Sequence, residues 1–224
     1  MSSIGDAITL WSWDRLDDFN FIDNKNVRIA PLLATFKSNK RGVLITELRH
    51  QGFRRPKDIK WIAVFRIEIE PQYQIKDRDL AQMVAVIRDL SMNASEVQID
   101  FDAKKSQRPF YKKFMQFLQE SLSIPISMTA LASWCTFDSW LDEMPVSYAV
   151  PMLYNLGNEK EVHYQHLKSK GFFYVKKCRG YLGLHMSDLE LLKDKKIKES
   201  HKIYLFNDKA WNQEHYITLM KKVE

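Results

Sequence analysis

Residues 97–103 read Val97-Gln98-Ile99-Asp100-Phe101-Asp102-Ala103, a short β-type run that ends in two carboxylates spaced i, i+2. Successive side chains of a strand point to opposite faces. Asp100 and Asp102 are therefore predicted to share one face, while Ile99 and Phe101 pack on the other. This stretch is the best candidate for a functional site, and the rest of the chain is predicted to form the frame that holds it.

Seven further runs have strand character, because they are rich in apolar and β-branched residues and end at turn-type residues. These runs centre on Leu10, Ile29, Val64, Met128, Val150, Leu182 and Leu205. Pro31 is expected to interrupt the second of them, and residues 43–48 to add a short extra strand or hairpin arm. The run at Met128 is predicted to extend from Pro125 to Trp134.

Apolar residues recur at helical spacing between most of these runs. The predicted helices cover residues 77–87, 110–118, a short segment near 137–141, a segment that Gly171 ends, and the C-terminal residues 211–223. Alternating strands and helices predict right-handed crossovers and a parallel sheet. Eight such strands predict an α/β fold, a single (β/α)8 TIM-like barrel that spans residues 1–224 as one domain and is short or irregular in places. A seven-stranded or partly open barrel is the alternative.

The formal net charge is +6, but lysines and acids are mixed along the chain. This pattern favours a solvated basic surface over a nucleic-acid site, so no nucleic-acid partner is expected. No stretch approaches the ~20 apolar residues of a membrane span, so no integral membrane segment is expected. The N-terminus lacks a signal-peptide pattern, and the chain is expected to be cytoplasmic as numbered, or exported if a leader was removed. Cys135 and Cys178 are expected to be two unpaired thiols, with a single bridge as the alternative.

Several runs, in the same order along nearly the whole chain, resemble a bacterial domain-of-unknown-function family of glycoside-hydrolase-like barrel proteins. The residues that carry the resemblance are Trp11–Arg15, Val64–Glu68, Val97–Asp102, Ser127–Trp134, Val150–Gly157, Cys178–Leu184, Ile203–Asn207 and Trp211. The resemblance implies a glycoside-hydrolase-like barrel that is often exported, and no established activity. The chain departs from the family pattern at Asp188, whose correspondence is open, and at Met152, which would make the pocket less polar.

Four acids and one arginine are the candidates for chemistry. Glycosidases use two carboxyl groups, about 5–5.5 Å apart in retaining enzymes and ~6.5–9.5 Å apart in inverting ones. Asp102, Asp100, Glu70 and Glu68 are the candidate catalytic residues, and Arg66 is placed to keep one acid ionised. The alternative is a buried ion-pair layer in which Arg66 bridges to Asp100 and serves only the fold. Asp102, nearest the strand's carboxyl end, is the strongest catalytic candidate.

Aromatic residues near predicted strand ends are candidates for stacking on sugar rings. They are Trp11, Trp13, Trp134 and Tyr154, and strand parity places Trp11 and Trp13 on the same side. Arg179 is a candidate for binding an anionic group, with a surface salt bridge as the alternative.

Other chemistry finds no support in the sequence. His163 and His166 lack a third ligand nearby, so no metal site is expected. The chain has no phosphate-binding loop, dinucleotide fingerprint or nucleophile elbow, so no cofactor is expected. The leading hypothesis is a barrel that binds a carbohydrate and hydrolyses a glycosidic bond with paired carboxylates. The rival is a catalytically inactive binding or scaffold module in the bacterial envelope.

Overall fold

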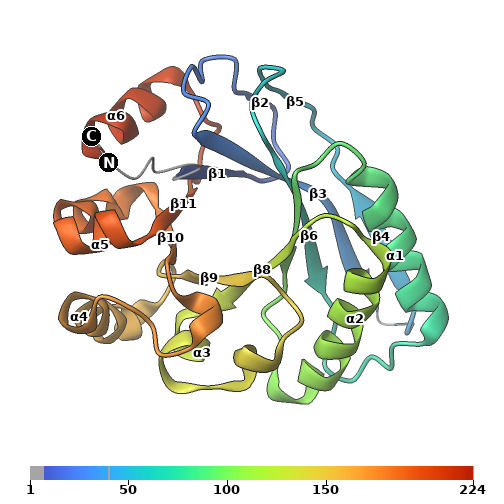
Figure 1. Ribbon diagram of the computed structural model, residues 1–224. Coiled ribbons are helices and arrows are strands. Elements are labelled where there is room, and N and C mark those ends of the chain that lie inside the picture. The colour runs from blue at the N-terminus through green and yellow to red at the C-terminus, as the bar shows by residue number, and fades with distance from the viewer. Residues whose placement is uncertain (1–7, 40, 224) are drawn as a thin grey trace.

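The structure is a computed structural model that describes residues 8–39 and 41–223. Eight parallel strands form a closed barrel in the order β1-β3-β6-β7-β8-β9-β10-β11, and β1 closes it by pairing with both β3 and β11 (Figure 1). The predicted α/β, TIM-like barrel is therefore confirmed. The seven-stranded alternative is wrong because eight strands form the barrel, and the open alternative is wrong because β1 and β11, its first and last strands, pair directly.

The barrel strands are short and evenly matched, with the exception of β3. They are β1 (Ile8–Ser12), β3 (Val27–Ser38), β6 (Ile62–Glu68), β7 (Glu96–Asp100), β8 (Ile126–Leu131), β9 (Tyr148–Met152), β10 (Tyr181–His185) and β11 (Lys202–Phe206). Pro31 does not interrupt β3, contrary to expectation. It pairs with Ser12 of β1, and the irregularity lies just beyond it, where the register between β3 and β6 shifts between Leu32 and Ala34.

Helices cover the barrel only from β6 onward (Figure 1). The α-helices are α1 (Asp77–Leu90), α2 (Arg108–Ser121), α3 (Ala132–Phe137), α4 (Lys160–Lys170), α5 (Lys195–Ser200) and α6 (Gln213–Val223). Five 3₁₀ segments join them: η1 (Lys105–Gln107), η2 (Trp140–Glu143), η3 (Gly157–Glu159), η4 (Lys176–Cys178) and η5 (Met186–Lys193).

The first two connections of the barrel contain strands where the repeating pattern would place helices. The two-residue strands β2 (Asp17–Asp18) and β5 (Phe53–Arg54) pair with each other, and β4 (Leu44–Leu48) runs antiparallel to the end of β3. The β3–β4 pair is the predicted hairpin at residues 43–48. It places a loop on the wall of the barrel beside the end of β6.

The residues at the ends of three helices explain where these helices begin or end. The side chain of Asp79 accepts a hydrogen bond from the backbone N–H of Lys76 at 2.9 Å and so caps the start of α1, whose stripe of Leu80, Met83 and Ile87 is buried. Pro109 lies in the first turn of α2, where its missing N–H costs nothing. Gly171 ends α4 with φ of +77°, as the sequence predicted.

Strand parity divides the core into two parts. Outward-facing residues such as Val97 and Ile99 pack with the helices in the larger cluster. Inward-facing residues form a smaller cluster inside the barrel, which includes Trp11, Val64 and Tyr204. Because both faces of the strands are covered, the fold itself fixes which side chains reach the barrel interior.

A buried ion pair lies inside the barrel near the amino ends of the strands. Arg28 of β3 is 3.3 Å from Glu96 of β7, and both side chains are almost fully buried. Arg28 also donates to the hydroxyl of Tyr204 at 2.8 Å, while Ser127 and Tyr148 donate to Glu96. Within this layer, each charged group therefore has an opposite charge and hydrogen-bond partners. The barrel interior therefore holds an ion-pair layer of Arg28 and Glu96 that the sequence did not suggest, in addition to the predicted contact between Arg66 and Asp100.

Cys135 and Cys178 form a disulfide that joins α3 to η4 across 43 residues of sequence. The expectation of two free thiols is wrong, and the alternative of a single bridge holds. Both residues are fully buried. The two cysteines lie in the layer between the barrel and its helices. Their spacing in the sequence does not predict that they are in contact.

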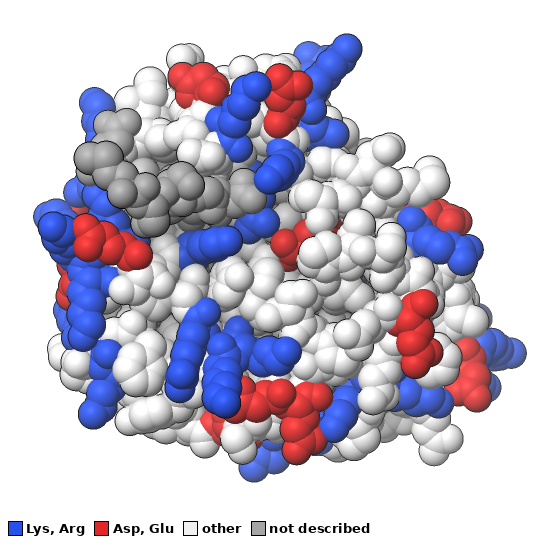
Figure 2. Space-filling view, viewed as in Figure 1, with Lys and Arg blue, Asp and Glu red and all other residues white. Residues whose placement is uncertain are grey.

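Basic and acidic side chains are interspersed on the face seen in Figure 2. Lys and Arg side chains lie beside Asp and Glu side chains around the rim, and further Lys and Arg side chains lie nearer the centre of the view. This mixture favours a solvated surface on that face over one continuous basic patch. Among the described residues, no helix combines the length and the apolar character needed to cross a membrane.

Candidate active site

A cavity of about 380 Å³ opens at the carboxyl ends of the barrel strands. In barrels of this kind, these ends and the loops that follow them hold the chemistry. The residues that line it come from six barrel strands or the loops just after them: Trp13, Arg66, Asp100, Asp102, Leu131, Met152, Tyr154, Asn155, Leu156 and Phe206. Five of the residues singled out in the sequence therefore meet in one cavity.

Asp100 and Asp102 both line this cavity, as their parity predicted. Asp100 is the last residue of β7 and is only 7% exposed, whereas Asp102 lies two residues later and is exposed at the mouth. The hydroxyl of Thr129 donates to Asp100 Oδ1 at 2.6 Å. Arg66 Nε lies 3.7 Å from Asp100 Oδ2.

The two aspartates have unusual titration behaviour. Burial raises the pKa of Asp100 to about 6; the hydrogen bond from Thr129 and the charge of Arg66 oppose this rise, and the charges of Asp102 and Glu68 add to it. Partial burial also raises the pKa of Asp102, against the opposing charge of Arg66. Two neighbouring carboxyl groups titrate as a coupled pair. In the pH range between their two pKa values, the pair holds one proton, which is the state that acid/base chemistry uses.

Arg66 links the acids to the aromatic wall. Its Nε is 2.9 Å from Glu68 Oε1, and its guanidinium carbon lies 5.5 Å from the ring centre of Trp13. The Arg66 side chain is 40% exposed. The alternative of a closed Arg66–Asp100 ion pair is thus only partly realised, because the pair is long and the guanidinium opens onto the cavity.

Glu68 and Glu70 lie on an adjoining wall. Glu68 is held by two cations, Arg66 and Lys37, the latter at 3.3 Å. Both glutamates are exposed and line a neighbouring cavity of about 260 Å³, which Asp100 and Asp102 also line. The four candidate acids are therefore adjacent, but only the two aspartates face the aromatic residues.

Three rings form the apolar side of the cavity. Phe206 stacks on Tyr154 with ring centres 5.3 Å apart and meets the edge of Trp13 at 5.9 Å. The Tyr154 hydroxyl donates to Met152 Sδ at 3.3 Å, so Met152, the position expected to reduce polarity, accepts a weak hydrogen bond through its sulfur. Burial, with the charges of Asp100 and Asp102, raises the Tyr154 pKa well above its usual value, so this hydroxyl stays protonated. Such a wall suits the C–H face of a sugar ring.

Trp11 supports this wall from below and does not line the cavity. It faces the barrel interior on the same side as Trp13, as predicted, but it is 3% exposed. Its Nε1 donates to Gln98 Oε1 at 2.7 Å, and its ring packs edge-on against Tyr154 at 6.2 Å. The prediction that Trp11 and Trp13 share one side is confirmed. They differ in depth, because Trp11 lies deeper inside the barrel and Trp13 lies at the cavity.

The other two predicted ligand contacts lie outside the cavity. Trp134 is buried in α3 and packs on Trp140 with ring centres 5.0 Å apart, because the chain turns from strand to helix after Leu131. Arg179 precedes β10, at the opposite end of the barrel, and donates to the carbonyls of Phe173 and Tyr174. Asp188, the uncertain family counterpart, is paired with Lys160 at 2.6 Å.

Sequence reasoning missed Thr129, Phe206 and Asn155, and also Leu131 and Leu156, which line the cavity. Thr129 and Phe206 face inward from β8 and β11 at the height of the acids, a position that only the strand register reveals. Asn155 follows β9 with φ of +57°, the only non-glycine residue of the described chain with a positive φ. Asn is one of the few residue types that adopt this region. A strained residue on the wall of a cavity is a frequent feature of functional sites.

The metal-ligating side-chain types are dispersed over residues 8–39 and 41–223. The two histidines with i, i+3 spacing have other roles: His163 is buried beside the hydroxyl of Thr136 at 3.1 Å, and His166 contacts the carbonyl of Phe172. No cluster of three or more His, Cys, Asp or Glu side chains suited to a metal ion occurs in these ranges.

Comparisons with known proteins add no relative. No family model matches the chain, and neither a curated protein nor a solved structure matches it. The resemblance to glycoside-hydrolase-like barrel proteins thus stays a prediction, and the functional argument rests on the cavity alone.

Proposed function

We propose that this protein binds a carbohydrate at the carboxyl end of its barrel and hydrolyses a glycosidic bond with Asp100 and Asp102. The observation that carries the proposal is the meeting of this acid pair with the rings of Trp13, Tyr154 and Phe206 in one cavity. Acids and rings that line one cavity suit a molecule with an apolar C–H face and a polar edge.

The pair supplies the two functions that glycoside hydrolysis needs. One carboxyl group gives a proton to the leaving oxygen, and the other carboxylate stabilises positive charge or activates water. Asp100 is the last residue of β7, and Asp102 lies two residues later, outside the strand. The rotamers of the two side chains determine whether their carboxyl groups reach the retaining or the inverting separation. The anomeric configuration of the first product, measured by NMR, decides between them.

The test is hydrolysis of a panel of aryl glycosides and of cello-, malto-, xylo- and chito-oligosaccharides. Asp102→Asn is expected to lower kcat by about 10²–10⁴-fold on any substrate that the unaltered protein cleaves, because it removes acid/base catalysis. The matched control is Asp89→Asn, which changes an exposed aspartate on α1 and is expected to leave the rate unchanged. Full activity of Asp102→Asn would rule out the proposed chemistry.

The second candidate is a carbohydrate-binding or scaffold module of the bacterial envelope without catalysis. The burial of Asp100 and its hydrogen bond from Thr129 favour it, because a carboxyl group held in this way also serves the fold. Binding of an oligosaccharide without turnover across the panel, with binding retained in Asp102→Asn, would support this candidate over the enzyme.

A further inference from the structure

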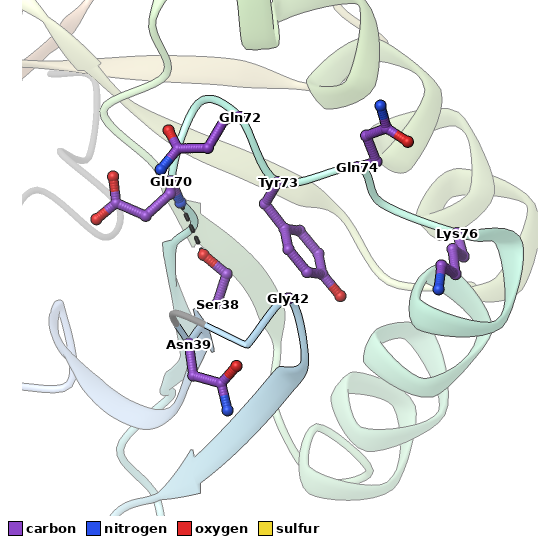
Figure 3. Close-up of a pocket in the computed structure, with 8 residues that line it drawn as sticks. All are labelled: Ser38, Asn39, Gly42, Glu70, Gln72, Tyr73, Gln74 and Lys76. Carbon is purple, nitrogen blue, oxygen red and sulfur yellow. Dashed lines mark hydrogen bonds between the residues drawn. The ribbon is translucent and has the colours of Figure 1, made fainter.

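A second, larger cavity lies beside the barrel mouth, between the β3–β4 hairpin and the loop that joins β6 to α1. Its volume is about 550 Å³. Figure 3 shows the residues around it: Ser38, Asn39, Gly42, Glu70, Gln72, Tyr73, Gln74 and Lys76. Glu70 and Gln72 lie at one end, Lys76 lies at the other, and the ring of Tyr73 is between them. Nothing in the proposed hydrolysis uses this cavity.

The lining of the cavity is polar but mostly uncharged. Amide side chains donate and accept hydrogen bonds at the same time, which matches the hydroxyl groups of a sugar. Gln72 and Gln74 are exposed, and neither side chain makes a hydrogen bond to another described residue. Their amides are therefore available to a ligand.

The aromatic ring of Tyr73 lines the cavity and is held in place by a hydrogen bond. Its hydroxyl donates to Asp79 Oδ2 at 3.0 Å, and Asp79 is itself tied to the start of α1. The ring is half-buried. The backbone N–H of Glu70 donates to Ser38 Oγ at 2.9 Å, which joins the loop to the end of β3 (Figure 3). A ring held on a fixed loop presents a surface for stacking at low entropic cost.

An intermediate cavity adjoins both of these cavities. The cavity of about 260 Å³ shares Arg66, Asp100 and Asp102 with the candidate active site, and it shares Glu70 with the outer cavity. The three cavities are therefore neighbours along the edge of the barrel, with Glu70 between the aspartates and the outer cavity. A linear ligand bound at the aspartates would have to pass Glu70 to reach Tyr73.

We infer that the cavity around Gln72, Tyr73 and Gln74 is a distal saccharide-binding subsite, and that the substrate is an oligosaccharide long enough to reach it from Asp102. This inference rests on the proposed function for its chemistry. Gln72 and Gln74 bind hydroxyl groups of a distal sugar unit, and Tyr73 packs against its C–H face. The subsite contributes to affinity for long chains and does not contact an aryl monosaccharide.

The experiment compares short and long ligands on one double variant. Gln72→Ala/Gln74→Ala is expected to weaken binding of the hexasaccharide by about tenfold, because it removes two modest hydrogen bonds. Its effect on the disaccharide, and on turnover of the aryl monosaccharide, is expected to be nil. Titration calorimetry gives the affinities, and the oligosaccharide panel of the hydrolysis test supplies the ligands. The matched control is Gln82→Ala, which changes an exposed glutamine of α1 that lines none of these three cavities.

The outcomes separate this inference from the proposed function. Turnover with equal affinity for short and long chains, or an equal loss for both in Gln72→Ala/Gln74→Ala, overturns the subsite and leaves hydrolysis standing. Length-dependent binding that requires Gln72 and Gln74, without turnover, supports the subsite and refutes hydrolysis. Absence of binding by every hexasaccharide overturns the subsite directly.

Discussion

Asp100 is a buried carboxyl group with a proposed catalytic role, and its burial changes the pH at which it holds a proton. Its carboxyl group is enclosed by the barrel, and its pKa is raised from 3.8 to about 6. If the pair must hold one proton to act, kcat/KM is expected to fall as the pH rises above about 6. A pH profile of kcat/KM measures this, and a rate that stays constant from pH 5 to pH 8 would contradict it.

The same shift predicts a stability effect with a defined sign. The folded state binds the Asp100 proton more tightly than the unfolded state, so this group's contribution to stability is fully present below pH 3.8 and is lost as the pH rises through about 6. The loss is at most about 3 kcal/mol. Asp100→Asn is therefore expected to gain stability relative to the unaltered protein as the pH is raised from 3.5 to 8.

Urea unfolding at the two pH values measures the gain. The control is Glu143→Gln, a fully exposed residue paired with Lys112, whose effect is expected to be small and of the opposite sign because its pKa is lowered. An identical difference between Asp100→Asn and the unaltered protein at both pH values would show that Asp100 has no shifted pKa.

Strands and helices differ in how far the sequence determines them. The acid stretch was placed correctly because period-two alternation gives the faces of a strand directly, and Asp100 and Asp102 both line the cavity. Trp134 was misplaced because an apolar run does not show where a strand gives way to a helix. Arg28 and Glu96 were missed because they are 68 residues apart, and only barrel closure brings them together.

The Arg28–Glu96 pair predicts a large stability effect inside the strand layer. Glu96→Gln is expected to lower the free energy of unfolding by roughly 3–5 kcal/mol, because it leaves the buried guanidinium of Arg28 without its counter-ion. Chemical denaturation measures the change. Glu68→Gln, which breaks exposed ion pairs, is the matched control and is expected to cost about 0–1 kcal/mol. Similar losses for both variants would show that burial does not set the energy of these pairs.

At the scale of the whole molecule, the disulfide connects parts of the barrel that are distant in sequence. Cys135→Ala/Cys178→Ala is expected to lower the free energy of unfolding by roughly 2–5 kcal/mol, because the bridge closes a long loop and constrains the unfolded chain. The same loss is expected for the unaltered protein in a reducing agent. Two thiols that react before reduction, with no change in unfolding on reduction, would contradict the bridge.

The closed barrel was predictable from eight strand-like runs, whereas the cavity depended on registers between strands that no single run contains. Such registers place Phe206 and Thr129 at the site. Arg179 lies outside the site because it comes before the amino end of β10, whereas the site is at the carboxyl ends of the strands. The acids of the site were therefore predictable from the sequence. The residues around them depend on the three-dimensional arrangement of the strands.

The most direct test of the proposed site is a crystal structure of Asp102→Asn with an oligosaccharide that the unaltered protein cleaves or binds. The expected result is a sugar ring against Trp13 and Tyr154, with the glycosidic oxygen within hydrogen-bond reach of Asn at position 102 and the chain continuing toward Glu70. A sugar bound elsewhere on the barrel, or Asp100 sealed from the ligand by Arg66, would contradict the account.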